Sequence, residues 1–566
     1  MTSSLVPTEA AAPAAAAPGR AGAAVRRVIG APTWADLALV PLLLGAALQV
    51  RRWWFGHPFW LDEESIAVNL RDTGFVELTG RLLFSQSAPL GWLWAERASL
   101  LAFGTSERAL RLLPLLFAIG TLVVFWLIAR RLLGPVATVV GTTMLAASPA
   151  LGRYAAELKQ YSSDTFWVLV LLGLAIALVA RPDRPPRYLL GWWAVAAAAG
   201  WFSMAATLAT PGLALVLLVV TARARGIRAT IRAALTGGSV WLAAFAVHYA
   251  IALRFTTEST FLRDFWITRG GLPPAGSDVL GRLAWLGGRP APLGVDPLWL
   301  LDRPVMLGFW LLVGAGLVVA AYRSRPVGAL LAAPLVTGVG LGLAGVVPLA
   351  SRLALWLVPV LWLTAAVAVD ALAALALRLG RRPDGPGRAG PGMWLPPAAA
   401  AVALGVVLVG CVVALRGQIA ADLERPRGPD RSDDRAAISW LRANHREGDL
   451  VVVAVESTPA VRWYAPGGRL RPGWYARGVG AAVPCTPAQF PEALRGYRRV
   501  LVYAIDAGAE VATYRALDAE LRRLGRPADE QRFDLGRAWI VELDPAAVAV
   551  PVTDRPATGC LVINRI

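Results

Sequence analysis

Three consecutive carboxylates, Asp62, Glu63 and Glu64, follow the first long apolar segment of the chain. That segment, residues 34–50, approaches the ~20 apolar residues that a helix needs to cross a bilayer. Basic residues precede it and favour a cytoplasmic N-terminus, so the carboxylates are expected on the opposite face. Carboxylates at a membrane boundary are poor anchors and good proton acceptors. Asp62 is therefore the first candidate for a catalytic base, with Glu63 orienting a substrate or completing the site.

Basic and aromatic side chains gather in other segments expected on the same face. Lys159 is the one lysine among 56 Lys and Arg residues, and a compact ammonium cannot be exchanged freely for a guanidinium. Tyr161 and Asp164 follow it closely, and two later loops carry Arg269 and Arg352. These cations are candidates for binding a phosphate, because Arg offers a bidentate fork and Lys a point charge. The polar residues between them are candidates for substrate binding.

Each candidate also has a purely structural interpretation. The first loop contributes Trp92 as a possible wall of a binding pocket, although Trp is also typical of the aromatic belt at a membrane surface. Lys159 could instead pair with Glu157 or Asp164. Arg352 could anchor its helix at the interface by snorkelling.

Composition indicates a polytopic membrane protein. Hydrophobic residues make up 56% of the chain and charged residues only 17%, against the usual quarter. The net charge of +18 does not indicate nucleic-acid binding, since the arginines cluster in short loops between apolar runs, as topology signals do. We expect no nucleic-acid partner and a lipid bilayer as the environment.

About eleven transmembrane helices are predicted from the apolar runs. The arginine-dense loops alternate with arginine-poor ones, which predicts a cytoplasmic N-terminus and an extracytoplasmic C-terminus. The predicted spans are 34–50, 108–129, 136–151, 165–180, 188–204, 207–221, 234–252, 304–321, 328–347, 353–377 and 395–415.

Changes in composition predict three parts. Residues 1–30 are expected to be a disordered cytoplasmic tail, because their start is Ala/Pro-rich and lacks the apolar core of a signal peptide. Residues 31–416 form the transmembrane domain, with extracytoplasmic loops 51–107, 152–164 and 253–303. Residues 417–566 read as a small extracytoplasmic α/β domain, with a helix capped by Asp433 or Asp434 and strands near 450–455, 500–505 and 538–543.

Cysteines and histidines do not predict a zinc site. Cys485 and Cys560 both fall in the outer domain, where a disulfide is chemically allowed but its distance cannot be read from sequence. Cys411 sits within the last apolar run and is expected to pack there. The carboxylates could hold a hard cation such as Mg²⁺ or Mn²⁺, but no residue pattern requires one.

Four motifs together resemble a known family. They are Trp-Leu-Asp-Glu-Glu at 60–64, Ser-Ala-Pro-Leu-Gly-Trp at 87–92, Arg-Tyr-x-x-Glu-Leu-Lys-Gln-Tyr-Ser-Ser-Asp at 153–164 and Pro-Leu-x-Ser-Arg-Leu at 348–353. This layout, over roughly residues 34–380, is similar to that of the bacterial GT-C glycosyltransferases, in particular the protein O-mannosyltransferases and the lipid A aminoarabinose transferases. A lysine in the third motif departs from the better-known mannosyltransferases, so donor recognition is expected to differ.

The resemblance implies a helical GT-C membrane fold and a sugar donor linked to a polyprenyl phosphate, used on the extracytoplasmic face of the plasma membrane. It also implies that Asp62, the first acidic residue after the first helix, is the catalytic carboxylate. Single displacement by an activated hydroxyl predicts inversion at the anomeric carbon. The sugar stays open, and the acceptor is a glycan, a lipid or a protein.

Two other classes of protein compete with a transferase. A transporter or flippase should carry ionisable residues within its helices and internal repeats, whereas the runs here are nearly free of charge except for Asp370. A non-catalytic scaffold would leave the charged residues of the outer loops unexplained. The transferase interpretation is favoured.

Overall fold

The computed structural model describes residues 33–182, 184–377, 395–424, 433–454, 457–466, 474–479, 494–505, 511–549 and 560–565. The expected tail at 1–30 lies outside these residues. So do Cys485 and the side chain of Cys560.

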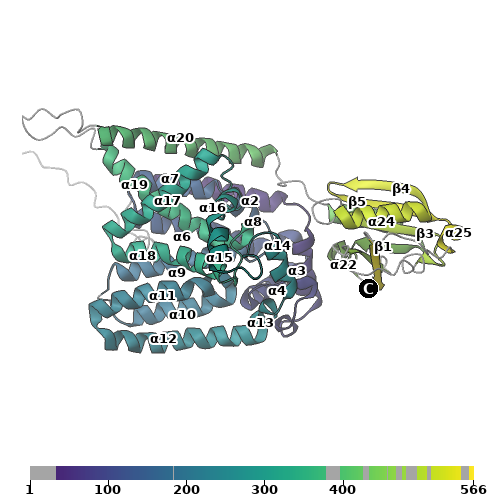
Figure 1. The fold of residues 1–566 in the computed structure, drawn as a ribbon, viewed down its shortest axis with the longest axis horizontal. Helices are drawn as coiled ribbons and strands as arrows, with labels where there is room; N and C mark the ends of the chain where they lie inside the picture. The colour runs from purple at the N-terminus through teal and green to yellow at the C-terminus, as the bar shows by residue number, and fades with distance from the viewer. Residues whose placement is uncertain are drawn as a thin grey trace, which may run out of the picture.

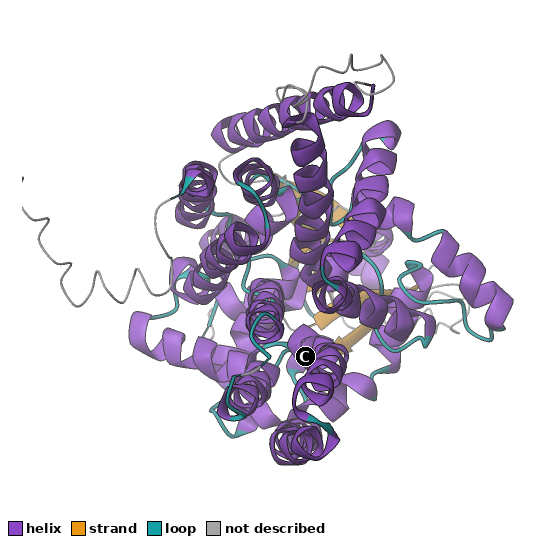
Figure 2. Ribbon diagram, turned by 90° about the vertical axis from the view of Figure 1, so that its left-hand side faces the viewer, coloured by secondary structure: helices purple, strands orange, loops and turns teal. Residues whose placement is uncertain are grey.

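A bundle of apolar helices forms most of the molecule, and a sheet lies at one end of it (Figure 1). Turned by 90°, the view shows the strands behind the helices (Figure 2). Within the described residues, nine helices are long and apolar enough to cross a membrane. They are Trp34–Phe55 (η1 and α2), Leu112–Leu132 (α6), Tyr161–Val179 (α9), Met204–Arg225 (α11), Ile227–Thr257 (α12 to α13), Arg303–Arg323 (α17), Arg325–Leu343 (α18), Ser351–Ala376 (η5 and α19) and Ala398–Ala421 within α20 (Leu395–Glu424).

Two of the predicted spans form shorter helices. α7 (Pro135–Ala146) has 12 residues and ends before Ser148, whose hydroxyl caps α8 (Pro149–Tyr154). α10 (Arg187–Phe202) has 16 residues and ends at Ser203, which caps α11 in the same way. At 1.5 Å per residue, α7 is about 18 Å long, short of the ~30 Å of a hydrocarbon core. Ser148 therefore divides the predicted span 136–151 into two helices, whereas Ser203 marks the boundary between two spans that were already predicted separately.

Short helices collect where the connections between spans are long. The first such connection holds α3 (Leu61–Asp72), η2 (Glu77–Thr79), η3 (Leu83–Ser85), α4 (Leu90–Phe103) and α5 (Glu107–Leu110). A later one holds α14 (Thr260–Thr268), α15 (Val279–Gly287) and α16 (Pro290–Val295). These segments coincide with the loops 51–107 and 253–303 of the sequence-based prediction.

The C-terminal part is a mixed six-stranded sheet with helices packed on it. The strand order is β4-β5-β3-β1-β2-β6, with β1 parallel to β2 and β3 and the other pairs antiparallel. The strands are β1 (Leu450–Ala454), β2 (Trp474–Val479), β3 (Arg499–Ile505), β4 (Gly525–Phe533), β5 (Gly536–Leu543) and β6 (Cys560–Arg565). The helices are α21 (Asp434–Asn444), α22 (Thr458–Tyr464), α24 (Val511–Leu524) and α25 (Pro545–Ala549).

Most of the elements expected in this part are present. Asp433 caps α21 by accepting a hydrogen bond from the Ala436 amide at 2.9 Å, and β1, β3 and β5 occupy the three predicted runs. The β4 strand is missed by the apolar pattern because it is an edge strand whose residues 526–532 are exposed and mostly polar. Edge strands tolerate such residues, since only one side of the ladder is paired.

Buried side chains form separate cores in the bundle and on the two faces of the sheet. A further apolar cluster joins α3 and α4 to α22, with Phe59, Ile66, Trp92 and Trp463 among its members. Within the bundle, α17 and α19 pack closely, and a Cβ at Gly316 would collide with the carbonyl oxygen of Thr364. Small residues at such contacts let membrane helices approach.

Candidate functional site

The acidic cluster forms the first turn of α3, at the end of the bundle nearest the sheet (Figure 1). Acidic side chains are favourable in a first turn, because the exposed amides there carry partial positive charge. Successive residues of a helix point about 100° apart, so the three carboxylates face three directions. Asp62 faces the tips of other membrane helices, Glu63 faces Arg111, and Glu64 faces the C-terminal part.

Two cations converge on one oxygen of Asp62. Its Oδ2 lies 2.7 Å from Nη1 of Arg352 and 3.9 Å from Nζ of Lys159. The Lys159 ammonium donates a hydrogen bond to Oε1 of Gln86 at 2.6 Å, and Gln86 also hydrogen-bonds to the carboxylate of Asp62. Three loops distant in sequence thus meet at Asp62: the first loop, which also carries Gln86, and the loops that carry Lys159 and Arg352.

Aromatic rings surround the guanidinium of Arg352. Its Cζ lies 5.9 Å from the centroid of Trp60 and 6.0 Å from that of Tyr161, within reach of cation–π attraction. Tyr161 packs edge-on against Tyr154 at 5.1 Å between centroids. The charged group is held beside flat apolar surfaces, a setting suited to the ring of a sugar.

The charges perturb one another. Burial raises the pKa of Asp62, but Lys159 and Arg352 lower it by more, so that the net pKa lies below the usual value. Burial lowers the pKa of Lys159, and the nearby Arg352 adds to this, while the attraction of Asp62 opposes it. Asp62 is therefore ionised at neutral pH.

A second ion pair, with a buried carboxylate and a partly exposed arginine, acts on the same site. Glu157, 2% exposed, accepts a hydrogen bond from Nε of Arg153 at 2.8 Å, and the charge of Glu157 acts on both Asp62 and Lys159. Three cations and two carboxylates thus share one region, which leaves it with positive charge suited to an anion.

Glu63 is engaged in a different structure. Its two oxygens accept from Nε and Nη2 of Arg111 at 2.7 and 2.6 Å, and Oε1 also accepts from the amide of Leu158 at 2.7 Å. The pair is buried, with 0% of the Glu63 side chain and 3% of the Arg111 side chain exposed. Glu63 therefore does not face the same space as Asp62. It links α3 to the segment that carries Lys159.

The other predicted residues divide between the site and its surroundings. Tyr161 lies against Arg352, as described above. Asp164 accepts hydrogen bonds from the Ser203 hydroxyl at 2.6 Å and the Ala205 amide at 3.1 Å, so it fixes the start of α11. Trp92 is 0% exposed within the apolar cluster of α3 and α4. The contacts of both residues belong to packing rather than to the surface around Asp62.

Arg269 ends α14, with its guanidinium 3.8 Å above the ring of Phe265. Within the part of the chain that the structure describes, no ion pair or ring contact joins Arg269 to Asp62, Lys159 or Arg352. Arg269 was grouped with the other loop cations only because of its position in the sequence. The path of the long 253–303 loop, which decides where Arg269 lies, cannot be predicted from that position.

Gln86 and Trp60 were missed as site residues, although Trp60 belongs to a motif noted in the sequence and Gln86 directly precedes another. Their types carry no charge to signal a role. An amide that accepts from Lys159 and reaches Asp62 can be recognised only once the loops are brought together.

No group of three His, Cys, Asp or Glu side chains placed to hold a metal ion occurs within the part of the chain that the structure describes. The carboxylates that could share a cation are directed to separate partners: Arg352 for Asp62, Arg111 for Glu63 and Ser203 for Asp164. An oxygen cage for Mg²⁺ or Mn²⁺ is not assembled from them.

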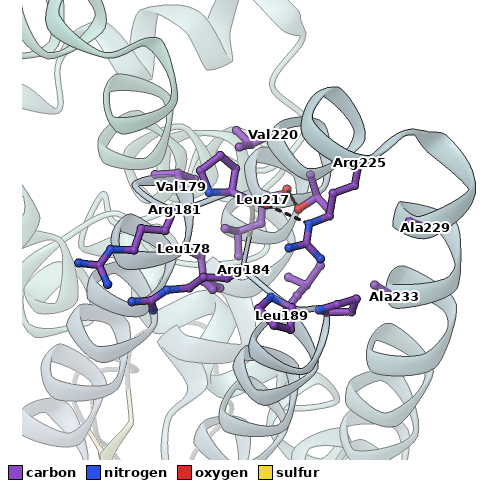
Figure 3. Close-up of a pocket in the computed structure, with 14 residues that line it drawn as sticks. Leu178, Val179, Arg181, Arg184, Leu189, Leu217, Val220, Arg225, Ala229 and Ala233 are labelled. Carbon is purple, nitrogen blue, oxygen red and sulfur yellow. Dashed lines mark hydrogen bonds between the residues drawn. The ribbon is translucent and has the colours of Figure 1, made fainter.

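A small pocket lies far from Asp62, at the opposite end of α9 (Figure 3). Its walls include Arg181, Arg184 and Arg225, and Nε of Arg225 donates to the carbonyl of Pro182 at 2.9 Å. The 19 residues of α9 make it about 28 Å long, so this pocket and Tyr161 are separated by that length. It is not part of the candidate site.

Comparison with known proteins identifies the class of fold. Residues 87–251 match a family described as dolichyl-phosphate-mannose-protein mannosyltransferase. The chain has the GT-C fold of integral-membrane glycosyltransferases. No curated protein sequence matches it.

Two solved structures are similar over almost the whole chain. The crystal structure of ArnT from Cupriavidus metallidurans in the apo state has 16% sequence identity and a TM-score of 0.50, covering 92% of this chain and 98% of that one. The structure of the same protein bound to undecaprenyl phosphate has 16% identity, the same coverage and a TM-score of 0.51. The expectation of a GT-C membrane fold is confirmed.

Proposed function

We propose that the chain is a membrane glycosyltransferase that moves a sugar from a polyprenyl phosphate to a hydroxyl group. The observation that carries the proposal is the meeting of one carboxylate, Asp62, with two cations, Lys159 and Arg352. Such a transfer needs a proton acceptor for the hydroxyl and positive charge for the departing phosphate. The likeness to a structure that binds undecaprenyl phosphate supports the lipid-linked donor. The reaction is assigned to the extracytoplasmic face of the plasma membrane, with the N-terminus cytoplasmic.

The proposed roles follow from the geometry. Arg352 and Lys159 bind the phosphate of the donor, Arg352 through two N–H groups and Lys159 as a point charge. Asp62 accepts the proton of the acceptor hydroxyl, whose oxygen forms a bond to the anomeric carbon. The bond from that carbon to the phosphate oxygen breaks, and the polyprenyl phosphate leaves with its charge stabilised by the two cations. One displacement inverts the anomeric carbon.

Binding of the donor would also tune the base. Arg352 and Lys159 now lower the pKa of Asp62. A phosphate that takes a share of their charge would raise this pKa and make Asp62 a better proton acceptor. The bound donor and the activated base are thus coupled through Arg352.

The test is consumption of a panel of synthetic polyprenyl-phosphate sugars by the purified protein, with water or a short-chain alcohol as acceptor. Asp62→Asn is compared with Asp264→Asn, which alters an exposed carboxylate on α14. We expect one donor to be turned over by the wild type and by Asp264→Asn, and turnover by Asp62→Asn to fall at least about 1,000-fold. Equal turnover by both variants would reject Asp62 as the base. Transbilayer movement of an unconsumed donor in vesicles would favour the transporter instead.

A further inference from the structure

The C-terminal part contacts the bundle through α22, which lies along α3. Trp463 of α22 is 6% exposed, and its ring lies 5.7 Å from that of Phe59 in the apolar cluster that includes Ile66 and Leu70. The helix that carries Asp62 therefore has one face on the membrane helices and another on the C-terminal part.

The start of α3 is held by a hydroxyl of this second part. The amide of Phe59 donates to Oη of Tyr464 at 2.8 Å, and that hydroxyl donates to Oε1 of Glu107 at 2.8 Å. Oε2 of Glu107 lies 2.9 Å from Nη1 of Arg435, which belongs to α21. Phe59 precedes Asp62 by three residues, so Tyr464 fixes the backbone just before the proposed base.

The end of α3 is held by the same short helix. Arg71 donates from Nη1 to the carbonyl of Trp463 at 3.0 Å and from Nη2 to that of Arg462 at 2.9 Å. Nε of Arg462 returns a hydrogen bond to Oδ2 of Asp72 at 2.9 Å. Arg71 thus satisfies carbonyls at the last turn of α22, where cations are favoured. One helix of seven residues binds both ends of α3.

Glu64 provides a third link. It is 0% exposed, and its carboxyl group lies close to Asp434, the first residue of α21. Asp434 also accepts a hydrogen bond from Tyr503 of β3. Two neighbouring carboxyl groups cannot both be ionised at low cost. Burial raises the pKa of Glu64 well above the usual value, and the charges of Asp434, Glu63 and Glu107 raise it further.

We propose that the C-terminal part positions the proposed catalytic base: Tyr464 and Glu64 hold α3 so that Asp62 meets Arg352 and Lys159. Neither residue touches the space around Asp62, and both act through the orientation of its helix. The three carboxylates of the acidic cluster then have distinct purposes, since Asp62 reacts, Glu63 ties α3 to the bundle and Glu64 ties it to α21. The part of this inference that concerns turnover rests on the proposed function.

The test is Tyr464→Phe in the full-length protein, with Tyr514→Phe as the matched control. Both changes delete one hydroxyl from the same part of the chain, but Tyr514 packs on Trp539 in the core of the sheet, away from α3. We expect hydrogen exchange of the amides of residues 59–72 to rise about ten-fold in Tyr464→Phe and to stay unchanged in Tyr514→Phe. Turnover should fall about ten-fold in Tyr464→Phe while KM for the donor changes less than about two-fold, because the cations that bind the phosphate lie on other segments.

A pH profile tests Glu64 separately from simple packing. A carboxyl whose pKa is raised in the folded protein stabilises it below its ordinary pKa, and that contribution is lost as pH rises through the raised value. The charged or titratable groups facing this pair are Glu63 and its partner Arg111, Glu107 and its partner Arg435, Tyr464 and Tyr503.

As pH rises above the ordinary carboxyl range and through the raised pKa of Glu64, protection of residues 59–72 should therefore decline in the wild type. Glu64→Gln has nearly the same shape and does not ionise, so its protection should stay level. Exchange that is unchanged in Tyr464→Phe, together with equal pH slopes for wild type and Glu64→Gln, would overturn the inference. Because exchange is read without a substrate, failure of the proposed transfer reaction alone would leave this result standing.

Discussion

Oδ2 of Asp62 and Nη1 of Arg352 lie 2.7 Å apart, joining the first turn of α3 to the start of η5. The same oxygen is 3.9 Å from Nζ of Lys159. A carboxylate between two cations is a weak base, because both stabilise its ionised form. The arrangement makes chemical sense if the cations also serve an anionic partner. A phosphate beside Arg352 relieves the carboxylate of part of this attraction.

Arg352→Gln should lower kcat/KM for the donor about 100-fold or more, because it removes a charged donor from the departing phosphate. Its pH profile should also change. Asp62 must be ionised to accept a proton, and in the wild type its lowered pKa puts the acid limb below the usual carboxyl range. Loss of Arg352 raises that pKa, so the acid limb should move to higher pH.

The measurement is kcat/KM against pH for the wild type, Arg352→Gln and Arg352→Lys. Arg352→Lys restores the charge without the bidentate fork, so it should recover the position of the acid limb but only part of the rate. Arg303→Gln, an exposed position at the start of α17, is the control for loss of one arginine. An acid limb at the same pH in every variant would contradict the coupling of Arg352 to Asp62.

Substitution of Lys159 should mainly weaken donor binding, whereas substitution of Arg269 should leave donor binding nearly unchanged. The side chain of Lys159 is 5% exposed and its ammonium is directed at Gln86 and Asp62, whereas Arg269 stacks on Phe265. We expect Lys159→Gln to raise KM for the donor about 10- to 100-fold and Arg269→Gln to change it less than about two-fold. Lys159→Arg should also bind poorly, since the larger guanidinium does not fit a site shaped around one nitrogen. The measurement is steady-state KM, and equal effects of Lys159→Gln and Arg269→Gln would contradict it.

The sequence predicted the class of fold because apolar runs and arginine-rich loops are long-range averages that single contacts do not alter. It also singled out Asp62, Lys159 and Arg352 by residue type and loop position, and the structure brings these three together. The partner that each carboxylate of the acidic cluster contacts could not be predicted. The difference between Asp62 and Glu63 is a rotation of about 100° on α3, and its direction depends on packing against helices distant in sequence.

Arg111 illustrates the same limit. It follows a four-residue helix at the start of an apolar run, where an arginine resembles an interface anchor. Arg111 can pair with Glu63 only because α3 approaches the start of α6. A local sequence pattern does not predict that approach. The role of Gln86 likewise depends on the fold of the first loop, since an uncharged amide gives no sign of proximity to Lys159.

The buried pair of Glu63 and Arg111 should contribute to stability rather than to the chemical step. Removing one partner leaves an uncompensated charge in a site that is almost completely closed to water. Arg111→Met should therefore destabilise the protein by about 3–5 kcal/mol. Glu63→Gln should also destabilise it, since Arg111 then lacks its counter-charge. The double variant Glu63→Gln, Arg111→Met should lose less stability than the sum of the single changes, because it leaves no charge unpaired.

Thermal unfolding in detergent gives the comparison, with turnover measured on the folded fraction of each variant. If Glu63 only links α3 to the segment of Lys159, turnover by the folded double variant should stay within about ten-fold of wild type. A collapse of turnover in Glu63→Gln that matches Asp62→Asn, without loss of stability, would instead place Glu63 in the reaction. The pair of measurements thus separates a carboxylate that reacts from its neighbour that holds the helix.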